Sequence, residues 1–556
     1  MEEVEQVAYK YAVKNAYEHD GKAQIGAVVG KVKALFPDSD LKKAMPLINS
    51  AVSMVNRMHK DMLNSEYSKF NAIGWELKRI EKEKTLPELD WVTKDTKIIT
   101  RVAPNPSGVM HFGHARPAVL TDEYVKRYGG KFILRFDDTD PKTKIPIAGV
   151  EKDFKKDFEW LGIKFDETVN ASDRLERYYE VIEKLINDGI AYVCECESEK
   201  WRKLIWASKA CKCRGKKPIE HMEKWKKMLA HEIKEGEAVV RIKTNLKDSD
   251  PSTRDWWAAK IVDEIDHPNP NSKNMHVWPS YNLASAVDDH DMEINLIIRG
   301  QEHIPNEEKQ KELYKHFGWT YPHCYYHGKV SKLGDMTLSK SKIKIIMESI
   351  GVERYDDPRM ATIKAFRRRG FTPGAIRKVI LDCGLSLKEV KISLEMFAAA
   401  NKVILGETKE YPFFEEAAQM EIYGMAPGVG ECYGDEVEFK AGVEKFFIDK
   451  KELVKYKNKK GIMVRFKKGF NAKIEDANEF NGRATFVSYS KAEHPIISWV
   501  KELVDIEILM SDGSTKRGFS SKSILLASGV VRIEGIGYAN IEEIKENIVK
   551  CVYSYD

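Results

Sequence analysis

A buried strand, a turn rich in proline and glycine, a helix and a second buried strand follow one another early in the chain. The strands are predicted over 97–103 and 131–136, and the helix over 114–128. A helix between two apolar strands is typical of a βαβ unit, in which both strands lie parallel in one sheet. Ligands of such sheets bind at the carboxyl ends of the strands. The pattern therefore predicts an α/β fold with a ligand site just after residue 103.

The turn of this unit ends in His111-Phe112-Gly113-His114, directly before the helix. Backbone N–H groups at a helix N-terminus, together with the helix dipole, favour phosphate. Gly113 would let a phosphate ligand lie against the backbone. More than two hundred residues later the chain carries Leu338-Ser339-Lys340-Ser341, whose ammonium could reach the same phosphates. Each segment alone also has an ordinary explanation, a helix cap for His111 and a solvated loop for Lys340.

Taken together, the two segments resemble the two signature sequences of class I aminoacyl-tRNA synthetases. Further matches, from about residue 97 to 370, are similar to glutamyl- and glutaminyl-tRNA synthetases. They are Thr100 to Ala115, Leu134 to Asp140, Tyr281 to Ser285, Val287 to His290 and Ile298 to Gly300. The stretch 356–370 and the strand-rich C-terminal third resemble the archaeal and eukaryotic branch, so the chain is identified as a member of the archaeal-type glutamyl-tRNA synthetases. It departs from the family at Thr337 and Leu338, where the late loop normally has Lys and Met.

The resemblance implies a class I Rossmann-like nucleotide-binding fold with several added domains. The expected parts are an N-terminal helical domain (1–95), a first catalytic half (96–144), an inserted acceptor-stem domain (145–253), a second catalytic half (254–345), a helical stem region (346–405) and a β-barrel anticodon-binding region (406–556). Two patterns point the same way without the resemblance. Apolar residues fall at helical spacing before residue 95, and short strands and turns dominate after 406.

The resemblance also implies the reaction, in which ATP with Mg2+ activates L-glutamate and the glutamyl group passes to tRNA-Glu. Such chemistry needs positioned donors and cations that stabilise charge on the phosphates, and no Ser-His-Asp arrangement. The expected catalytic residues are His111, His114 and Lys340, and Gly113, Ser339 and Ser341 complete the ATP site. The expected glutamate pocket consists of Arg101, Ala103, Asn105, Asp137, Tyr281, Ser285 and Arg299.

Arg299 distinguishes glutamate from glutamine, because a buried guanidinium facing a neutral amide would be an unpaired charge. Glutaminyl relatives carry a small uncharged residue at this place. A structural Arg299, paired with Asp288 or Asp289, is the alternative. Two other functions stay open, a non-catalytic tRNA-binding or scaffold protein and a glutaminyl enzyme. The retained pocket residues argue against the first and Arg299 against the second, while charging of tRNA-Gln as an additional substrate is undecided.

Cys194-x-Cys196 and Cys211-x-Cys213 form a second group of candidate residues. Four thiolates in two pairs suit a tetrahedral zinc site. The spacing within each pair is tighter than the usual two to four residues, whereas related enzymes often carry zinc in this inserted region. Four free or partly oxidised cysteines are the alternative.

Composition restricts the partners only loosely. Lys and Arg number 91 against 86 Asp and Glu, a net charge of +5, so any RNA-binding surface must be a local patch. Candidate basic stretches are 200–203, 214–217, 367–369, 455–460 and 465–468. No apolar stretch is long enough for a membrane helix, the acidic N-terminus is no secretory signal, and eight Cys in 556 residues are too few for a disulfide scaffold. We therefore expect a cytoplasmic protein with tRNA as partner and neither membrane nor DNA.

Overall fold

A computed structural model describes residues 2–36, 41–73, 85–333 and 355–556. Backbone contacts divide the chain into two units, Met1–Lys84 and Thr85–Asp556, each of which is described by itself. The predicted late ATP loop, with Ser339, Lys340 and Ser341, lies outside the described residues.

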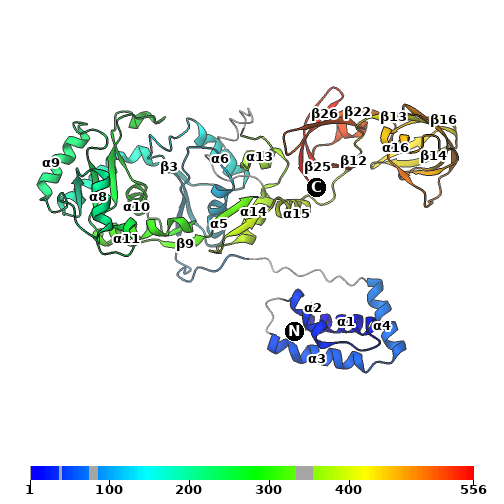
Figure 1. The fold of residues 1–556 in the computed structure, drawn as a ribbon, viewed down its shortest axis with the longest axis horizontal. Helices are drawn as coiled ribbons and strands as arrows, with labels where there is room; N and C mark the ends of the chain where they lie inside the picture. Colours follow the sequence, from blue (N-terminus) through cyan, green and yellow to red (C-terminus); the bar gives the residue numbers. More distant parts are fainter. Residues whose placement is uncertain (1, 37–40, 74–84, 334–354) are drawn as a thin grey trace. The chain divides into compact units, whose positions relative to one another are not determined.

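The N-terminal unit consists of helices, drawn in blue in Figure 1. They are α1 (Glu2–Glu18), α2 (Ile25–Leu35), α3 (Leu41–Asn56) and α4 (Lys60–Ile73). Helix α1 packs against the other three, and Ala8, Ala12, Val32 and Ile48 are among the fully buried side chains between them. The apolar positions at helical spacing therefore form the core of a small helical domain.

Five strands of the described chain form a parallel sheet with the order β3-β2-β1-β8-β9. They are β1 (Ile98–Val102), β2 (Gly130–Phe136), β3 (Glu167–Asn170), β8 (Leu296–Gly300) and β9 (His323–His327). Helix α5 (Phe112–Tyr128) connects β1 to β2, and α6 (Val150–Trp160) lies between β2 and β3. The strand order reverses between β1 and β8, which is where α/β sheets bind their ligands. The predicted Rossmann-like fold is confirmed.

The core of this region lies between the sheet and α5, which also packs against α14 (Pro373–Cys383). Leu86 and Leu89 are buried in the same core. The segment just before β1, which the sequence analysis assigned to the N-terminal helical domain, therefore packs with the catalytic sheet. Helices α13 (Ile363–Arg368) and α15 (Leu394–Leu405) and the short pair β10 (Val330–Leu333) and β11 (Val390–Ile392) complete this part.

A second, antiparallel sheet lies in the insertion between β3 and β8. Its strands are β4 (Ala191–Cys194), β5 (Val239–Ile242), β6 (Trp257–Ile261) and β7 (Val277–Pro279), and the neighbouring helices are α7 (Leu175–Asn187), α8 (Ser198–Trp206), α9 (Pro218–Leu229), α10 (Tyr281–Asp291) and α11 (Ile304–Phe317). Trp225 and Trp278 are fully buried in its separate core. Because β6 and β7 belong to this sheet, the inserted structure continues beyond residue 253.

The C-terminal region contains two larger β-sheets (Figure 1). The six-stranded sheet consists of β12 (Glu410–Tyr411), β22 (Leu503–Leu509), β23 (Thr515–Ser521), β24 (Gly529–Ile533), β25 (Gly537–Lys545) and β26 (Ile548–Tyr555). The seven-stranded sheet consists of β13 (Ala417–Met425), β16 (Gly442–Asp449), β17 (Met463–Phe466), β18 (Asn471–Ala477), β19 (Asn481–Ser488), β20 (Ile496–Ile497) and β21 (Trp499–Val500), with the hairpin β14 (Gly428–Cys432) and β15 (Asp435–Phe439) and the helix α16 (Lys450–Lys455) beside it.

Both sheets bring their edges together, as barrels do. The edges of the seven-stranded sheet, β20 and β21, are consecutive in the chain and separated only by Ser498. In the other sheet, Phe414 follows the edge strand β12 and pairs with Phe519 of the opposite edge, β23. Closure leaves few unpaired backbone groups at the edges. The predicted C-terminal β-barrel region is confirmed.

Within the described residues, we find no helix that combines the length and the apolar character needed to cross a bilayer.

Candidate active site

A cavity of about 610 Å³ lies at the carboxyl ends of β1, β2 and β8. It brings together predicted residues from four separate stretches of the chain. Those that line it are Arg101, Ala103, Asn105, His111, Gly113, His114, Asp137, Tyr281 and Arg299. The location agrees with the switch point of the parallel sheet, so the sheet topology is what assembles these distant residues.

The two histidines cap the N-terminus of α5. Gly113 N–H donates to His111 Nδ1 at 3.0 Å, and His111 N–H donates to His114 Nδ1 at 3.3 Å. Because each Nδ1 accepts, each neutral ring carries its proton on Nε2. The rings stack with their centroids 4.0 Å apart. A Cβ on Gly113 would lie 2.8 Å from His111 Cε1, so glycine is needed for the ring to fold over the first turn. His111 therefore caps α5, which was its ordinary explanation, and it also lines the cavity.

Arg101, at the end of β1, is buried and forms a two-pronged ion pair with Asp289 of α10. Its Nε and Nη2 donate to the two carboxylate oxygens, each at 2.8 Å. Ser285 supports this pair, since its hydroxyl donates to Asp289 at 3.2 Å and accepts from Arg101 at 3.4 Å. Burial lowers the pKa of Arg101, Asp289 and Tyr281 raise it, and the net shift is upward. Asp289 thus already occupies one edge of the Arg101 guanidinium, which was predicted to bind the substrate.

Tyr281 and Ser285 lie one turn apart on α10, whose N-terminus is capped by Ser280. The Ser280 hydroxyl accepts from Leu283 N–H at 3.3 Å. Residues four apart share a helix face, so Tyr281, Ser285 and Asp289 form one row. Tyr281 lines the cavity, whereas Ser285 is buried beneath it and acts on Arg101 and Asp289.

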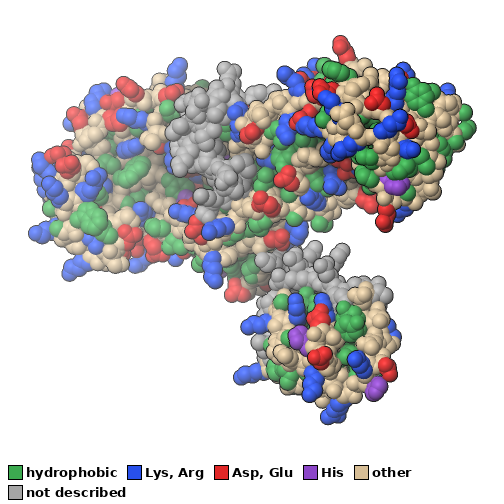
Figure 2. Space-filling model, turned by 45° about the vertical axis from the view of Figure 1, so that its right-hand side comes forward, with side chains coloured by type: hydrophobic (Ala, Val, Ile, Leu, Met, Phe, Trp, Pro, Cys, Tyr) green, Lys and Arg blue, Asp and Glu red, His purple; other side chains and the backbone are tan. Residues whose placement is uncertain are grey.

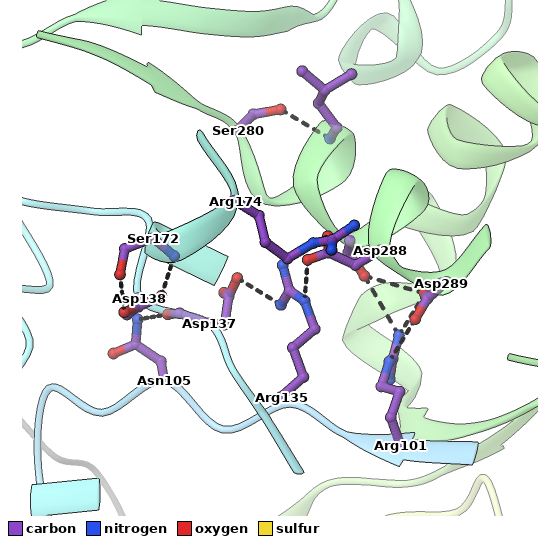
Figure 3. Close-up of polar contacts among 12 residues, drawn as sticks. Arg101, Asn105, Arg135, Asp137, Asp138, Ser172, Arg174, Ser280, Asp288 and Asp289 are labelled. Carbon is purple, nitrogen blue, oxygen red and sulfur yellow. Dashed lines mark hydrogen bonds and ion pairs between the residues drawn. The ribbon is translucent and has the colours of Figure 1, made fainter. Parts of the chain in front are cut away.

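Asp137, just after β2, is positioned by a buried ion network (Figure 3). Arg135 donates to Asp137 at 3.1 Å and to the fully buried Asp288 at 2.6 Å. Asp288 also accepts from Arg174 at 2.7 Å. Asn105 donates from its amide to the Asp137 backbone oxygen at 2.7 Å, which joins the ends of β1 and β2. The Asp137 carboxylate is therefore held at the cavity, where it could accept from an ammonium.

Arg299, at the end of β8, has different surroundings from those of Arg101. Asp288 and Asp289 are engaged by Arg135 and Arg101, so the alternative of a structural Arg299 paired with either of them does not hold. Its guanidinium is 5% exposed and donates to Gln310, Tyr321, Tyr326 and the sulfur of Cys324. Burial lowers the pKa of Arg299, but the phenols and the thiol around it, led by Tyr281, raise it by more.

Two further histidines line the cavity, His303 after β8 and His327 at the end of β9. Burial lowers the pKa of both, and that of His327 falls to about 4 with a further contribution from Arg116. Both rings are therefore neutral near pH 7. The sequence analysis did not include them, although His327 ends β9 and His303 comes shortly after β8, and ligand-binding residues gather at the carboxyl ends of such strands.

The four predicted cysteines come together in the insertion. Their sulfur atoms all lie within 4.8 Å of one another, with 3.9 Å between Cys194 and Cys211 and 3.8 Å between Cys196 and Cys213. None of the four forms a disulfide. A tetrahedral zinc ion with bonds of about 2.3 Å requires sulfur atoms about 3.8 Å apart. The donor set and its spacing therefore fit zinc. We call residues 194–217, which contain this cluster, the cysteine module.

Comparison with known proteins agrees with this geometry. Residues 97–406 match the family model described as tRNA synthetases class I (E and Q), catalytic domain. The fold and site thus define a class I aminoacyl-tRNA synthetase. Over the full length of both proteins, the chain is 40% identical to the glutamate–tRNA ligase of Pyrococcus abyssi and 40% identical to that of Pyrococcus furiosus. It belongs to the glutamate–tRNA ligase family.

A solved structure of glutamate–tRNA synthetase from Elizabethkingia anophelis is a more distant match. It is 23% identical, with a TM-score of 0.41, and the alignment covers 56% of this chain and 71% of that one.

Proposed function

We propose that the cavity at the switch point of the sheet is where this chain activates L-glutamate and charges tRNA-Glu. An oxygen of the α-carboxylate attacks the α-phosphorus of ATP, and pyrophosphate leaves. A hydroxyl of the 3′-terminal adenosine of the tRNA then attacks the carbonyl carbon of the glutamyl-adenylate, and AMP leaves.

The observation that carries this proposal is the state of Arg299. Its hydrogen bonds go to neutral groups, so its charge is available for an anionic side chain. Glutamate and glutamine have nearly the same volume, and a fixed positive charge is what separates them. Asp137 would accept from the substrate ammonium. Arg101 would contribute the guanidinium edge that Asp289 does not occupy, and Ala103, Asn105, Tyr281 and Ser285 would shape or support the pocket.

ATP would lie against the N-terminus of α5. The Nε2–H donors of His111 and His114, the backbone N–H groups of the first turn and the helix dipole suit its phosphates. The resemblance assigns Lys340, Ser339 and Ser341 to the same phosphates, with Lys340 stabilising the departing pyrophosphate. Mg2+ would be carried in through the phosphate oxygens.

Zinc would be held by Cys194, Cys196, Cys211 and Cys213 as a structural ion. The ion would link the cysteines before helix α8 to those after it. The family relation also supports a place in translation in the cytoplasm. tRNA-Gln is a candidate second tRNA substrate, to which the protein would also attach glutamate.

The test is a charging assay with purified tRNA-Glu and tRNA-Gln, each offered labelled glutamate or glutamine. We expect glutamate on tRNA-Glu and no glutamine on either tRNA. Glutamate on tRNA-Gln would add that substrate. Failure to charge glutamate at all would favour a non-catalytic tRNA-binding protein, and transfer of glutamine would favour a glutaminyl enzyme.

Arg299→Ala tests the residue that carries the proposal. Removing one partner of a buried charge pair costs about 2–5 kcal/mol, or roughly 30- to several-thousand-fold. We expect kcat/KM for glutamate to fall by such a factor and the preference for glutamate over glutamine to narrow. A variant that charges glutamate at full efficiency and still rejects glutamine would show that the pocket is wrongly assigned.

A further inference from the structure

Gln310, on α11, is a buried hydrogen-bond partner of Arg299. Arg299 Nη1 donates to Gln310 Oε1 at 3.1 Å, and the Tyr321 hydroxyl donates to the same oxygen at 2.8 Å. Gln310 is only 1% exposed. A guanidinium has no acceptor, so the amide must turn its oxygen and not its nitrogen toward Arg299. The orientation of this amide is therefore determined by its partners.

The other acceptors around Arg299 are neutral as well. Its Nη2 lies 3.0 Å from the Tyr321 hydroxyl and 3.3 Å from that of Tyr326. Among the described residues, the carboxylate that comes within ion-pair distance is Glu307, 3.6 Å from Nη2. Glu307 is itself shared, because it pairs with Lys311 at 2.6 Å and accepts from the Tyr326 hydroxyl. The protein thus fixes the guanidinium while neutralising little of its charge.

Arg101 shows what a carboxylate does in the same cavity. Asp289 takes two of its N–H groups at 2.8 Å each, in a buried and nearly ideal ion pair. Such a guanidinium has much less charge to offer a ligand. A glutamate side chain at position 310 would have the same oxygen in nearly the same place, and it would turn Arg299 into a second neutralised arginine.

We propose that Gln310 is a specificity-determining positioning residue, whose neutral amide orients Arg299 and preserves its charge for the carboxylate of the amino-acid substrate. This inference rests on the proposed function. The uncharged state of residue 310 would then matter more than its hydrogen bond. An added charge would compete with the substrate carboxylate for Arg299, whereas a lost acceptor would only leave Arg299 less well oriented.

The test compares Gln310→Glu with Gln310→Met, which removes the acceptor without adding a charge. KM and kcat are measured for glutamate and for ATP with tRNA present, together with competition by glutamine. We expect Gln310→Glu to raise KM for glutamate by about 30-fold or more, since a competing internal carboxylate takes the charge pair. KM for ATP should change little, and the preference for glutamate over glutamine should narrow. Gln310→Met should raise KM for glutamate by a smaller factor.

Two controls separate this role from packing. Gln419→Glu makes the same chemical change in the half-buried β13 and should leave glutamate KM unaltered. Tyr321→Phe removes the hydroxyl that accepts from Arg299 and donates to Gln310. At about 0.5–1.5 kcal/mol for each of these two hydrogen bonds, KM for glutamate should rise by roughly 5- to 150-fold. If the Gln310 variants do not fold, this variant still tests the neutral partners that hold Arg299, and an unchanged KM for glutamate would overturn the proposal.

The remaining outcomes are also decisive. A folded Gln310→Glu protein with the parent's KM for glutamate would overturn the inference. Equal KM increases in Gln310→Glu and Gln310→Met would show that residue 310 acts by packing alone. Both results differ from failure of the proposed function, in which the unchanged protein itself does not charge glutamate.

Discussion

The cysteine module and the segment 450–460, which we call the lysine segment, are both rich in basic residues but differ in how much of their charge is neutralised. The cysteine module contains eight Lys and Arg against three acidic residues, Glu195, Glu197 and Glu199. Among the described residues, Arg202, Lys203, Lys209 and Lys217 form no ion pair, and all four are exposed. In the lysine segment, five of the six lysines pair with carboxylates of the same barrel.

Several cations of the stretches 367–369 and 465–468 are also engaged by other groups of the protein. Arg368 pairs with Glu542, and Arg369 is buried and donates to backbone oxygens near the C-terminus. Lys467 bridges Glu410 and Glu534, each at 2.9 Å. Figure 2 shows basic and acidic side chains interspersed over the face in view. Counting lysines therefore overestimates the charge available to RNA phosphates, which need cations that no carboxylate has already neutralised.

Of the changes that test the difference between the two regions, we expect the loss of the metal from the cysteine module to have the largest effect. Structural zinc in small peptides contributes an apparent binding free energy of about 10–16 kcal/mol, which depends on its deprotonated ligands. We expect Cys211→Ser to abolish stoichiometric zinc, expose the cysteine module to proteolysis and raise KM for tRNA. Elemental analysis and limited proteolysis measure the first two. Cys383→Ser, outside the cluster, is the control, and a full zinc equivalent in the Cys211→Ser protein would contradict the site.

A smaller effect is expected from the exposed aromatic residue of the module. Trp206 is 68% exposed at the end of α8, beside the unpaired cations. Stacking of a base on an aromatic side chain is worth about 1–3 kcal/mol, or roughly 5- to 150-fold in affinity. Trp206→Ala should weaken tRNA binding by such a factor and leave KM for glutamate unchanged.

The matched aromatic residue of the other region is Phe480, which is 75% exposed and has the Lys450 ammonium 5.7 Å from its ring centre. Because that ring already has a cation over it, Phe480→Ala should weaken tRNA binding less than Trp206→Ala. Filter binding at one salt concentration measures both losses of tRNA affinity. A larger loss in Phe480→Ala than in Trp206→Ala would show that the lysine segment, and not the cysteine module, offers the more available RNA surface.

The smallest of the three effects concerns individual phosphate contacts. Each contact contributes about 0.7–0.9 to the slope of log affinity against log salt. The double change Lys203→Ala with Lys209→Ala should lower that slope by about 1.4–1.8 and weaken tRNA binding by about tenfold at physiological salt. The paired lysines offer the control, and Lys450→Ala with Lys455→Ala should change the slope by less than one. Equal slopes for the two double variants would show that the ion pairs of the lysine segment open when RNA binds.

Local patterns were enough to predict several parts of the molecule. The apolar strands on either side of α5 predicted a parallel sheet, because a helix between two short apolar strands is typical of a βαβ unit. The position of His111 and His114 followed from the same short stretch, since a helix cap is a local structure. The four cysteines that the sequence analysis grouped also lie close together in the structure, and the sequence alone left zinc and free thiols as alternatives.

The pairing of charges could not be predicted in this way. Arg101 and Asp289 are 188 residues apart, and they meet because β1 lies beside β8 and α10 packs nearby. Gln310 reaches Arg299 because α11 folds back beside the end of β8, and His327 reaches the cavity because β9 pairs with β8. The basic stretch 455–460 looked as available for RNA as 200–203 and 214–217, because two of its carboxylate partners, Glu475 and Glu479, lie on β18 and in the turn after it.

The sequence by itself thus determined which elements form and which residue types reach the cavity, because propensity, periodicity and caps act over a few residues. Only the tertiary structure decided that Arg101 is paired with a carboxylate of the protein, whereas Arg299 is held mainly by neutral groups. It also decided which basic surface has few carboxylates beside it. The reason is physical. An ion pair depends on the distance and burial of two groups, and these are set by strand order and packing between segments that no local pattern connects.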